Sequence, residues 1–231
     1  MADRGDLPTA QRLIKADCAP GLAATRIAES LVQGNVLAVI STDYRARDVA
    51  AALQGAAPEA EAIFFPPSDA LPGDAQPPTA SNTGLRLAAL RQIRETLAAG
   101  GRARIAVITT AEAASELLPD PKVFEKPLAA FNVGDALETS TFRKTVMALG
   151  YFEDDRVDEP AEFAIRGKVI DIFPAGASAP VRIELADGEI VRIREFDSVS
   201  QRGLEELDFV EIGPAMELEL PAKPKTLFDY L

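Results

Sequence analysis

Apolar runs alternate with helix-forming stretches along the first half of the chain. Three short, nearly unbroken apolar runs are present: VLAVIST (36–42), AIFFP (62–66) and RIAVITT (104–110). Such runs are typical of strands that are buried on both faces of a parallel sheet. Four stretches that favour helix alternate with them: 21–33, 44–54, 85–97 and a segment from about 111. The alternation predicts a parallel α/β layer with right-handed crossovers.

The pattern changes after Leu118, where the prolines of PDP (119–121) break the chain. FEKPLAAF (124–131) is a strand candidate, and 134–149 has the pattern of a helix that ends at Gly150. Strand patterns dominate from Tyr151 onward: AEFAIRG (161–167), KVIDIFP (168–174), PVRIEL (180–185), EIVRIREF (189–196) and DFVEIG (208–213). Asp187-Gly188 between two of them indicates a hairpin. This half therefore predicts an α+β lobe with an antiparallel sheet.

We therefore predict two structural units, an α/β lobe over 1–118 and an α+β lobe over 119–214. The segment 215–231 ends in PAKPKTLFDYL, whose prolines and lysines indicate a linker-like tail with one apolar cluster at its end.

Composition narrows the chemistry that the chain can perform. With 47% apolar and 26% charged residues, it has the composition of a globular protein. Histidine is absent and Cys18 is the single cysteine, which excludes a His-based triad, imidazole metal ligands, an internal disulfide and a thiolate zinc cluster. We expect no catalytic residues, no metal and no cofactor.

The charge argues against DNA as a ligand of the isolated chain. Of the net charge of −12, residues 119–231 carry −10 and residues 1–118 carry −2, and acidic surfaces repel phosphate backbones. No run approaches the length of a membrane span, and the polar N-terminus lacks the apolar core of a signal peptide. The expected location is the cytoplasm.

A phosphate-binding loop would have to lie in CAPGLAATRIA (18–28), just before the first helix. That chemistry needs several glycines, a lysine and a hydroxyl. The segment offers only Gly21 and Thr25, and Arg26 would lie on the helix rather than in the loop. An ordinary loop and helix start is the favoured interpretation.

A run of carboxylates is the other candidate for chemistry. Its members fall within seven residues: Glu153, Asp154, Asp155, Asp158 and Glu159. Oxygen ligands of this kind can bind a divalent cation, but such a run is more often a solvated turn, which is the interpretation we favour.

Three ordered segments resemble the N-terminal region of the bacterial transcription-repair coupling factor family, Mfd, and more distantly UvrB. They are FPPSDALPGDAQPPTASNTGLRLAALRQI (65–93), IAVITTAEAASELLPDP (105–121) and EFAIRGKVIDIFPAGASAPVRIELADGEIVRIREFDSVSQRGLEE (162–206). The resemblance covers about residues 10–215, and the third segment is its most specific part. It implies a degenerate P-loop-NTPase-like α/β lobe followed by a lobe similar to UvrB domain 2.

Within this pair of families, Mfd fits better. The loop 66–82 is too short for the damage-probing hairpin that the resemblance to UvrB would place there, and the absent phosphate-loop residues match the Mfd pattern. The resemblance implies a non-catalytic module that recruits UvrA in nucleotide excision repair. In longer family members, RNA polymerase is contacted through domains that do not fit in 231 residues.

The resemblance also implies partner-binding positions. The family pattern of an Arg before Gly, an Arg opening the next strand and an aromatic four residues later falls on Arg166, Arg182 and Ala186. Both arginines match the pattern, and alanine replaces the aromatic. For each arginine, a surface salt bridge is the alternative role.

The strand through 181–186 raises a question of register. Alternation puts Val181, Ile183 and Leu185 on a core face and leaves Arg182 toward solvent. A two-residue turn at Asp187-Gly188 would pair Arg182 with Ile193 and place apolar side chains on the polar face. Either a β-bulge shifts the register or the polar face is partly covered.

Two alternatives to a UvrA-recruiting module remain at this point. The chain is a short Mfd-like relative or regulatory fragment that has lost UvrA binding, as Ala186 suggests, or it is a hydrolase with an atypical nucleotide site. The hydrolase would need a positive pocket at the carboxyl ends of the first-half strands.

Overall fold

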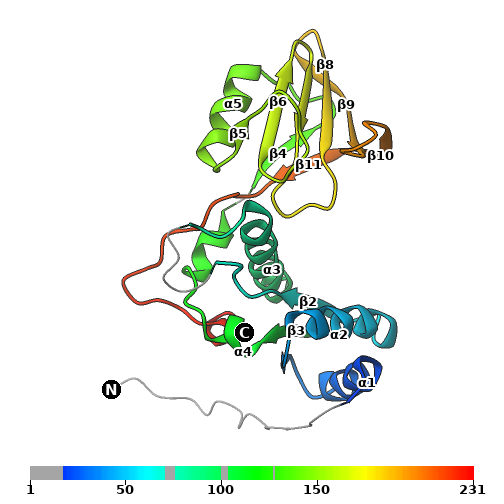
Figure 1. Ribbon diagram of the computed structural model, residues 1–231, viewed down its shortest axis with the longest axis vertical. Coiled ribbons are helices and arrows are strands. Elements are labelled where there is room, and N and C mark those ends of the chain that lie inside the picture. Colours follow the sequence, from blue (N-terminus) through cyan, green and yellow to red (C-terminus); the bar gives the residue numbers. More distant parts are fainter. Residues whose placement is uncertain (1–17, 71–75, 100–103, 127) are drawn as a thin grey trace.

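The computed structural model describes residues 18–70, 76–99, 104–126 and 128–231. The chain has a mixed α/β fold. A parallel sheet with helices forms one part, and antiparallel pairing dominates the other (Figure 1). We refer to these parts as the α/β lobe and the antiparallel lobe.

The α/β lobe is built on a three-stranded parallel sheet in the order β1-β3-β2. The strands are β1 (Val36–Ile40), β2 (Glu61–Phe65) and β3 (Ile105–Thr110), and all six residues of the central strand are buried. The helices are α1 (Pro20–Leu31), α2 (Asp43–Ala56), α3 (Ala80–Ala98) and α4 (Ala111–Ser115). The three predicted strands and their parallel arrangement are confirmed.

The alternation of side chains along β3 divides the core of this lobe in two. Ile105 and Val107 belong to a cluster with residues of α3, whereas Ala106 and Ile108 belong to one with residues of α1 and α2. A strand covered by helices on both faces must be apolar at every position, which explains the unbroken run in the sequence.

The antiparallel lobe contains a six-stranded sheet in the order β10-β9-β8-β7-β6-β5, in which only the outermost pair β5–β6 is parallel. Its strands are β5 (Phe152–Glu153), β6 (Glu162–Arg166), β7 (Val169–Ile172), β8 (Val181–Ala186), β9 (Glu189–Phe196) and β10 (Gly203–Leu207). A separate pair joins β4 (Ala129–Asn132) and β11 (Phe209–Ile212), and α5 (Thr139–Ala148) packs nearby.

Two expectations for this lobe need correction. Residues 124–131 are not one strand, because a 3-10 turn (Pro121–Glu125) precedes β4. The helix predicted from 134 begins only at Thr139. Before it, Asp135 accepts hydrogen bonds from Asn132, and the Leu137 amide donates to Gly188. Pairing with the β8–β9 turn thus competes with helix formation over 134–138.

The end of the chain returns to the α/β lobe. Leu227 and Tyr230 are fully buried in the same cluster as the α3 side chains, and the Leu118 amide donates to the Lys225 carbonyl oxygen. The Tyr230 hydroxyl donates a 2.8 Å hydrogen bond to the Pro119 carbonyl oxygen. The apolar cluster predicted at the end of the chain therefore belongs to a core, and is not part of a free linker.

The β8–β9 hairpin contains the β-bulge that was one of the two alternatives. Ala186 pairs with Glu189 across the Asp187-Gly188 turn, but the register shifts between Glu184 and Leu185. Both turn residues have positive φ, which the tight two-residue turn requires. Val191 is the extra residue on β9, and its side chain is exposed. The shift returns Ile193 to the core face.

Candidate protein-binding site

The two faces of the six-stranded sheet differ in chemistry. Ile170, Ile183 and Ile193 pair side by side across β7, β8 and β9 and are buried on the core face. On the opposite face, one cross-strand row carries four consecutive partners: Ala164, Asp171, Arg182 and Arg194. A buried carboxylate thus lies between strands that carry arginines.

Asp171 brings the two predicted arginines together. Arg182 holds its carboxylate with two hydrogen bonds, from Nε to Oδ1 at 2.6 Å and from Nη2 to Oδ2 at 2.8 Å. Arg166 reaches Oδ2 from its Nη1 at 3.1 Å, and its Nη2 donates to the Asp155 carbonyl oxygen at 2.9 Å. The Asp171 side chain is 1% exposed, whereas those of Arg182 and Arg166 are 19% and 47% exposed.

Two further contacts hold Arg182. Its guanidinium carbon lies 4.8 Å from the ring centroid of Phe196, in a cation–π arrangement. Its Nη2 also donates to the side-chain oxygen of Gln201 at 3.3 Å. Hydrogen bonding to Asp171 raises the pKa of Arg182 above its ordinary value, so the guanidinium stays charged at any physiological pH.

The polar face of this sheet is also partly covered, which was the second explanation offered for the register of the β8–β9 hairpin. Phe196 packs with Val157, Ala164 and Phe173 in a small buried cluster. Val157 comes from the loop between β5 and β6, and Arg156 in that loop donates to the Ser198 carbonyl oxygen in the loop after β9. The bulge and the cover therefore both occur.

Ala186 lies apart from the two arginines. It is the last residue of β8, four residues beyond Arg182, or about 13 Å at the rise of a strand. Its side chain is on the same face as Arg182 and is partly exposed. Arg166 lies toward the same end of the sheet as Ala186. It pairs with Val169 on β7, which in turn pairs with Glu184 on β8, two residues before Ala186. The three positions therefore share a face, with Ala186 at the hairpin tip.

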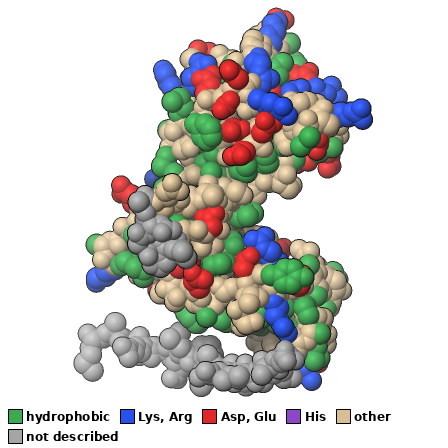
Figure 2. Space-filling view, viewed as in Figure 1, with side chains coloured by type: hydrophobic (Ala, Val, Ile, Leu, Met, Phe, Trp, Pro, Cys, Tyr) green, Lys and Arg blue, Asp and Glu red, His purple; other side chains and the backbone are tan. Residues whose placement is uncertain are grey.

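The other arginines of this face are held by surface carboxylates. Arg194 pairs with Glu184 at 2.9 Å, and Arg192 contacts Glu206 on β10. Figure 2 shows acidic and basic side chains intermixed on the antiparallel lobe. The distinguishing feature of the Arg166–Asp171–Arg182 cluster is therefore its buried carboxylate.

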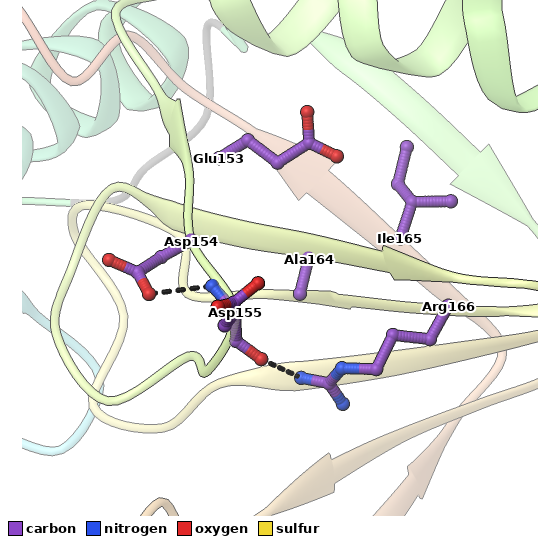
Figure 3. Close-up of a pocket in the computed structure, with 6 residues that line it drawn as sticks. All are labelled: Glu153, Asp154, Asp155, Ala164, Ile165 and Arg166. Carbon is purple, nitrogen blue, oxygen red and sulfur yellow. Dashed lines mark hydrogen bonds between the residues drawn. The ribbon is translucent and has the colours of Figure 1, made fainter.

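The carboxylate run lies beside the arginines. Glu153, Asp154 and Asp155 line a shallow depression with Ala164, Ile165 and Arg166 (Figure 3). Arg143 binds Glu153 through two hydrogen bonds, which lower the pKa of that carboxyl, and Asp154 accepts from the Asp155 amide. Within the described parts of the chain, no three acidic or cysteine side chains come close enough to share a metal ion.

The segment 18–28 forms the start of α1. Pro20 opens the helix and so removes one of the terminal N–H groups that a phosphate would need. Thr25 donates to the Gly21 carbonyl oxygen, and Arg26 pairs with Glu29 on the exposed side of the helix. The Thr25 and Arg26 side chains therefore bond to other residues of α1. Among the helices that the structure describes, none combines the length and the hydropathy of a membrane span.

Sequence reasoning missed Asp171. The signal was present, since a lone carboxylate interrupts the apolar run of KVIDIFP. A charged residue is rarely fully buried unless it is paired. That position therefore implied a cationic partner on a neighbouring strand.

Comparison with known proteins gives matches that include the antiparallel lobe. The UvrB interaction domain family matches residues 130–218, which include the whole six-stranded sheet. The transcription-repair-coupling factor of Bacillus subtilis is 38% identical over 119 residues, which is 52% of this chain and 10% of that protein. That of Haemophilus influenzae is 28% identical over 215 residues, or 92% of this chain and 18% of that protein.

A third relative, the transcription-repair-coupling factor of Escherichia coli, is 39% identical over 84 residues, or 36% of this chain and 7% of that protein. The chain spans less than a fifth of the length of these relatives. Residues 130–218 thus carry the features of a UvrB interaction domain, and the chain is similar to the N-terminal region of the transcription-repair-coupling factors.

Proposed function

We propose that this chain is a non-catalytic interaction module that recruits UvrA in transcription-coupled nucleotide excision repair. The match to the UvrB interaction domain supports a protein-binding role for the antiparallel lobe. The observation that carries the proposal is the pair of arginines fixed on one buried carboxylate. We place the binding surface on the sheet face with Arg166, Arg182 and Ala186.

The arginine pair keeps donors for a partner. Within the described residues, Nη1 of Arg182 and Nε of Arg166 donate no hydrogen bond. A planar guanidinium with free N–H groups suits a carboxylate on a partner protein. Two arginines share the one buried carboxylate of Asp171, and Asp154 and Asp155 line the depression beside Arg166.

The test is the affinity of purified UvrA for the chain, measured by calorimetry. Arg166 is the cleaner position to change, because Arg182 still neutralises Asp171 when Arg166 is lost. Arg166→Ala should weaken binding by about 2 kcal/mol or more if the pair is desolvated in the complex. Arg26→Ala, which removes an exposed arginine on α1, serves as the matched control.

Equal affinity of UvrA for the parent and for Arg166→Ala would place the binding surface elsewhere. Absence of any UvrA binding by the parent would favour the regulatory fragment. The hydrolase alternative is tested by titration with Mg-ATP, for which we expect no saturable heat. A saturable signal that disappears in Arg26→Ala would establish a nucleotide site at 18–28.

A further inference from the structure

We propose that Asp171 is a positioning residue, which holds Arg166 and Arg182 as one preorganised receptor for a partner carboxylate. This inference rests on the proposed function, because the receptor acts in UvrA binding. It concerns a residue that touches no partner itself, since its carboxylate is buried beneath the two arginines. Its effect is exerted through the guanidinium groups that it holds.

In Arg182, the nitrogen atoms that the fold holds differ from the one that a ligand could contact. Asp171 accepts hydrogen bonds from Nε and Nη2 of Arg182, and the Gln201 side-chain oxygen accepts one from the same Nη2. The guanidinium carbon of Arg182 lies over the Phe196 ring. The remaining amino group, Nη1, makes no hydrogen bond among the described residues. One edge of the guanidinium is thus fixed by the fold and another is left to a ligand.

The loop after β9 is shaped to reach Arg182. Gln201 has a positive φ of 59°, a backbone conformation that residues other than glycine, asparagine and aspartate rarely adopt. Its amide donates to the Asp197 carbonyl oxygen, and its side-chain nitrogen donates to the Ser198 carbonyl oxygen. These hydrogen bonds fix the Gln201 side-chain oxygen beside the Arg182 guanidinium. The loop after β9 therefore helps to immobilise Arg182.

Preorganisation predicts the sign of a substitution at Asp171. An arginine that is already immobile loses less conformational entropy when a ligand binds. Asp171→Asn keeps the shape of the side chain but removes the charge and one acceptor oxygen, so both arginines become mobile. If Asp171 merely occupies the arginines, the same substitution frees two positive charges and binding to an acidic partner becomes tighter.

The experiment measures UvrA affinity for the parent, Asp171→Asn, Arg182→Ala and the double variant, at a temperature where all are folded. We expect Asp171→Asn to bind about tenfold more weakly than the parent, with little further loss when Arg182→Ala is already present. Unchanged or tighter binding by Asp171→Asn, or full additivity of the two losses, would overturn the proposal. If Asp171→Asn fails to fold, Arg182→Lys replaces it, because lysine keeps the charge and cannot hold Asp171 with a fork. Parent-like affinity of Arg182→Lys would then count against positioning.

A readout that does not need UvrA separates this inference from the proposed function. In nitrogen-15 NMR spectra of the free chain, the Nε–H group of Arg182 should give a resolved, slowly exchanging signal that Asp171→Asn abolishes. Arg26 supplies the reference, because it is half-exposed and its Nε donates no hydrogen bond among the described residues, although its Nη1 pairs with Glu29. If Arg182 exchanges as fast as Arg26, positioning is refuted whatever UvrA does. If Arg182 is protected and the parent does not bind UvrA, only the proposed function is lost.

Discussion

Gly84 in α3 lies against Gly176 in the loop between β7 and β8, so the two lobes meet through backbone. A Cβ atom at Gly176 would lie 3.1 Å from the Gly84 carbonyl oxygen, and one at Gly84 would lie 2.3 Å from the carbonyl carbon of Ala175. No side chain fits at Gly84 unless the loop or the helix moves. This contact joins the scaffold helix to the sheet that carries the arginine pair.

Gly84→Ala should therefore destabilise the chain by about 1–3 kcal/mol, because the new methyl group meets backbone that cannot rotate away. Urea unfolding provides the measurement. Gly55→Ala is the matched control, since that glycine is also in a helix but has nothing within 4 Å of its Cβ position. The control should gain at most about 0.5–1 kcal/mol from helix propensity, because that is the mid-helix value and Gly55 lies in the last turn of α2. A similar gain for Gly84→Ala would show that the lobes do not meet there in solution.

The packing of the chain end leads to a second prediction, based on two neighbouring residues. Leu227 is fully buried in the α/β core, whereas Phe228 is 70% exposed. Leu227→Ala should cost about 2–5 kcal/mol of unfolding free energy, as large-to-small changes in a packed core do. Phe228→Ala should change it by less than about 0.5 kcal/mol. Thermal melts of both variants would detect the difference. Equal melting temperatures would show that Leu227 does not pack in the α/β core and that 215–231 behaves as a linker.

Much of this fold follows from the sequence pattern, and the exceptions have tertiary causes. The apolar runs at 36–42, 62–66 and 104–110 predicted the parallel strands because burial on both faces leaves no polar position. Residues 134–138 have a helical pattern but are taken by pairing with the β8–β9 turn. The apolar cluster predicted at the end of 215–231 lies in the α/β core through Leu227 and Tyr230, and the sequence of that segment alone does not indicate where the cluster packs.

The candidate site shows the same limit. Alternation along 181–186 placed Arg182 on the outer face, and this placement is confirmed by the burial of Val181, Ile183 and Leu185. The charge complement of that face was not predictable from one strand. It depends on Asp171, which lies on a different strand and reaches the arginines only through the register of β7 with β8.

Alkaline pH should destabilise the chain through Tyr151. Its hydroxyl accepts a hydrogen bond from the Ala175 amide and donates one to the Gly213 carbonyl oxygen, and burial raises the pKa of this phenol to about 12. The unfolded phenol ionises near pH 10, so between about pH 10 and 12 the folded state holds a proton that the unfolded state has lost. Stability should therefore be intact below about pH 10 and should fall as the pH rises toward 12.

Tyr151→Phe isolates this effect. At neutral pH the variant should lose about 1–3 kcal/mol, because the buried Ala175 amide loses its acceptor. Above pH 10 its stability should fall less steeply than that of the parent, by up to about 1.4 kcal/mol per pH unit, since one titrating group is gone. Burial also raises the pKa of Tyr230, so the variant keeps part of the slope. Parallel curves for parent and variant would show that Tyr151 ionises equally in both states.

The last prediction concerns the hairpin tip. Ala186 is on the same face as Arg182 and is partly exposed, at the position where the resemblance to the family expects an aromatic residue. A phenylalanine there would project beside the Asp187-Gly188 turn and offer an apolar anchor on the same face as the arginine pair, about 13 Å along β8 from Arg182. Buried aromatic anchors contribute about 2 kcal/mol or more to many interfaces. Ala186→Phe should therefore bind UvrA about tenfold or more tightly than the parent.

Calorimetry with UvrA measures this gain, and Val32→Phe is the control for adventitious stickiness, because Val32 is 81% exposed on the α/β lobe. The gain should disappear when Arg166→Ala is added if the anchor and the arginines engage the same partner surface, because the anchor alone does not fix the orientation of the complex. An equal gain from Val32→Phe would mean that UvrA responds to any exposed aromatic. An unchanged affinity of Ala186→Phe would place the hairpin tip outside the interface.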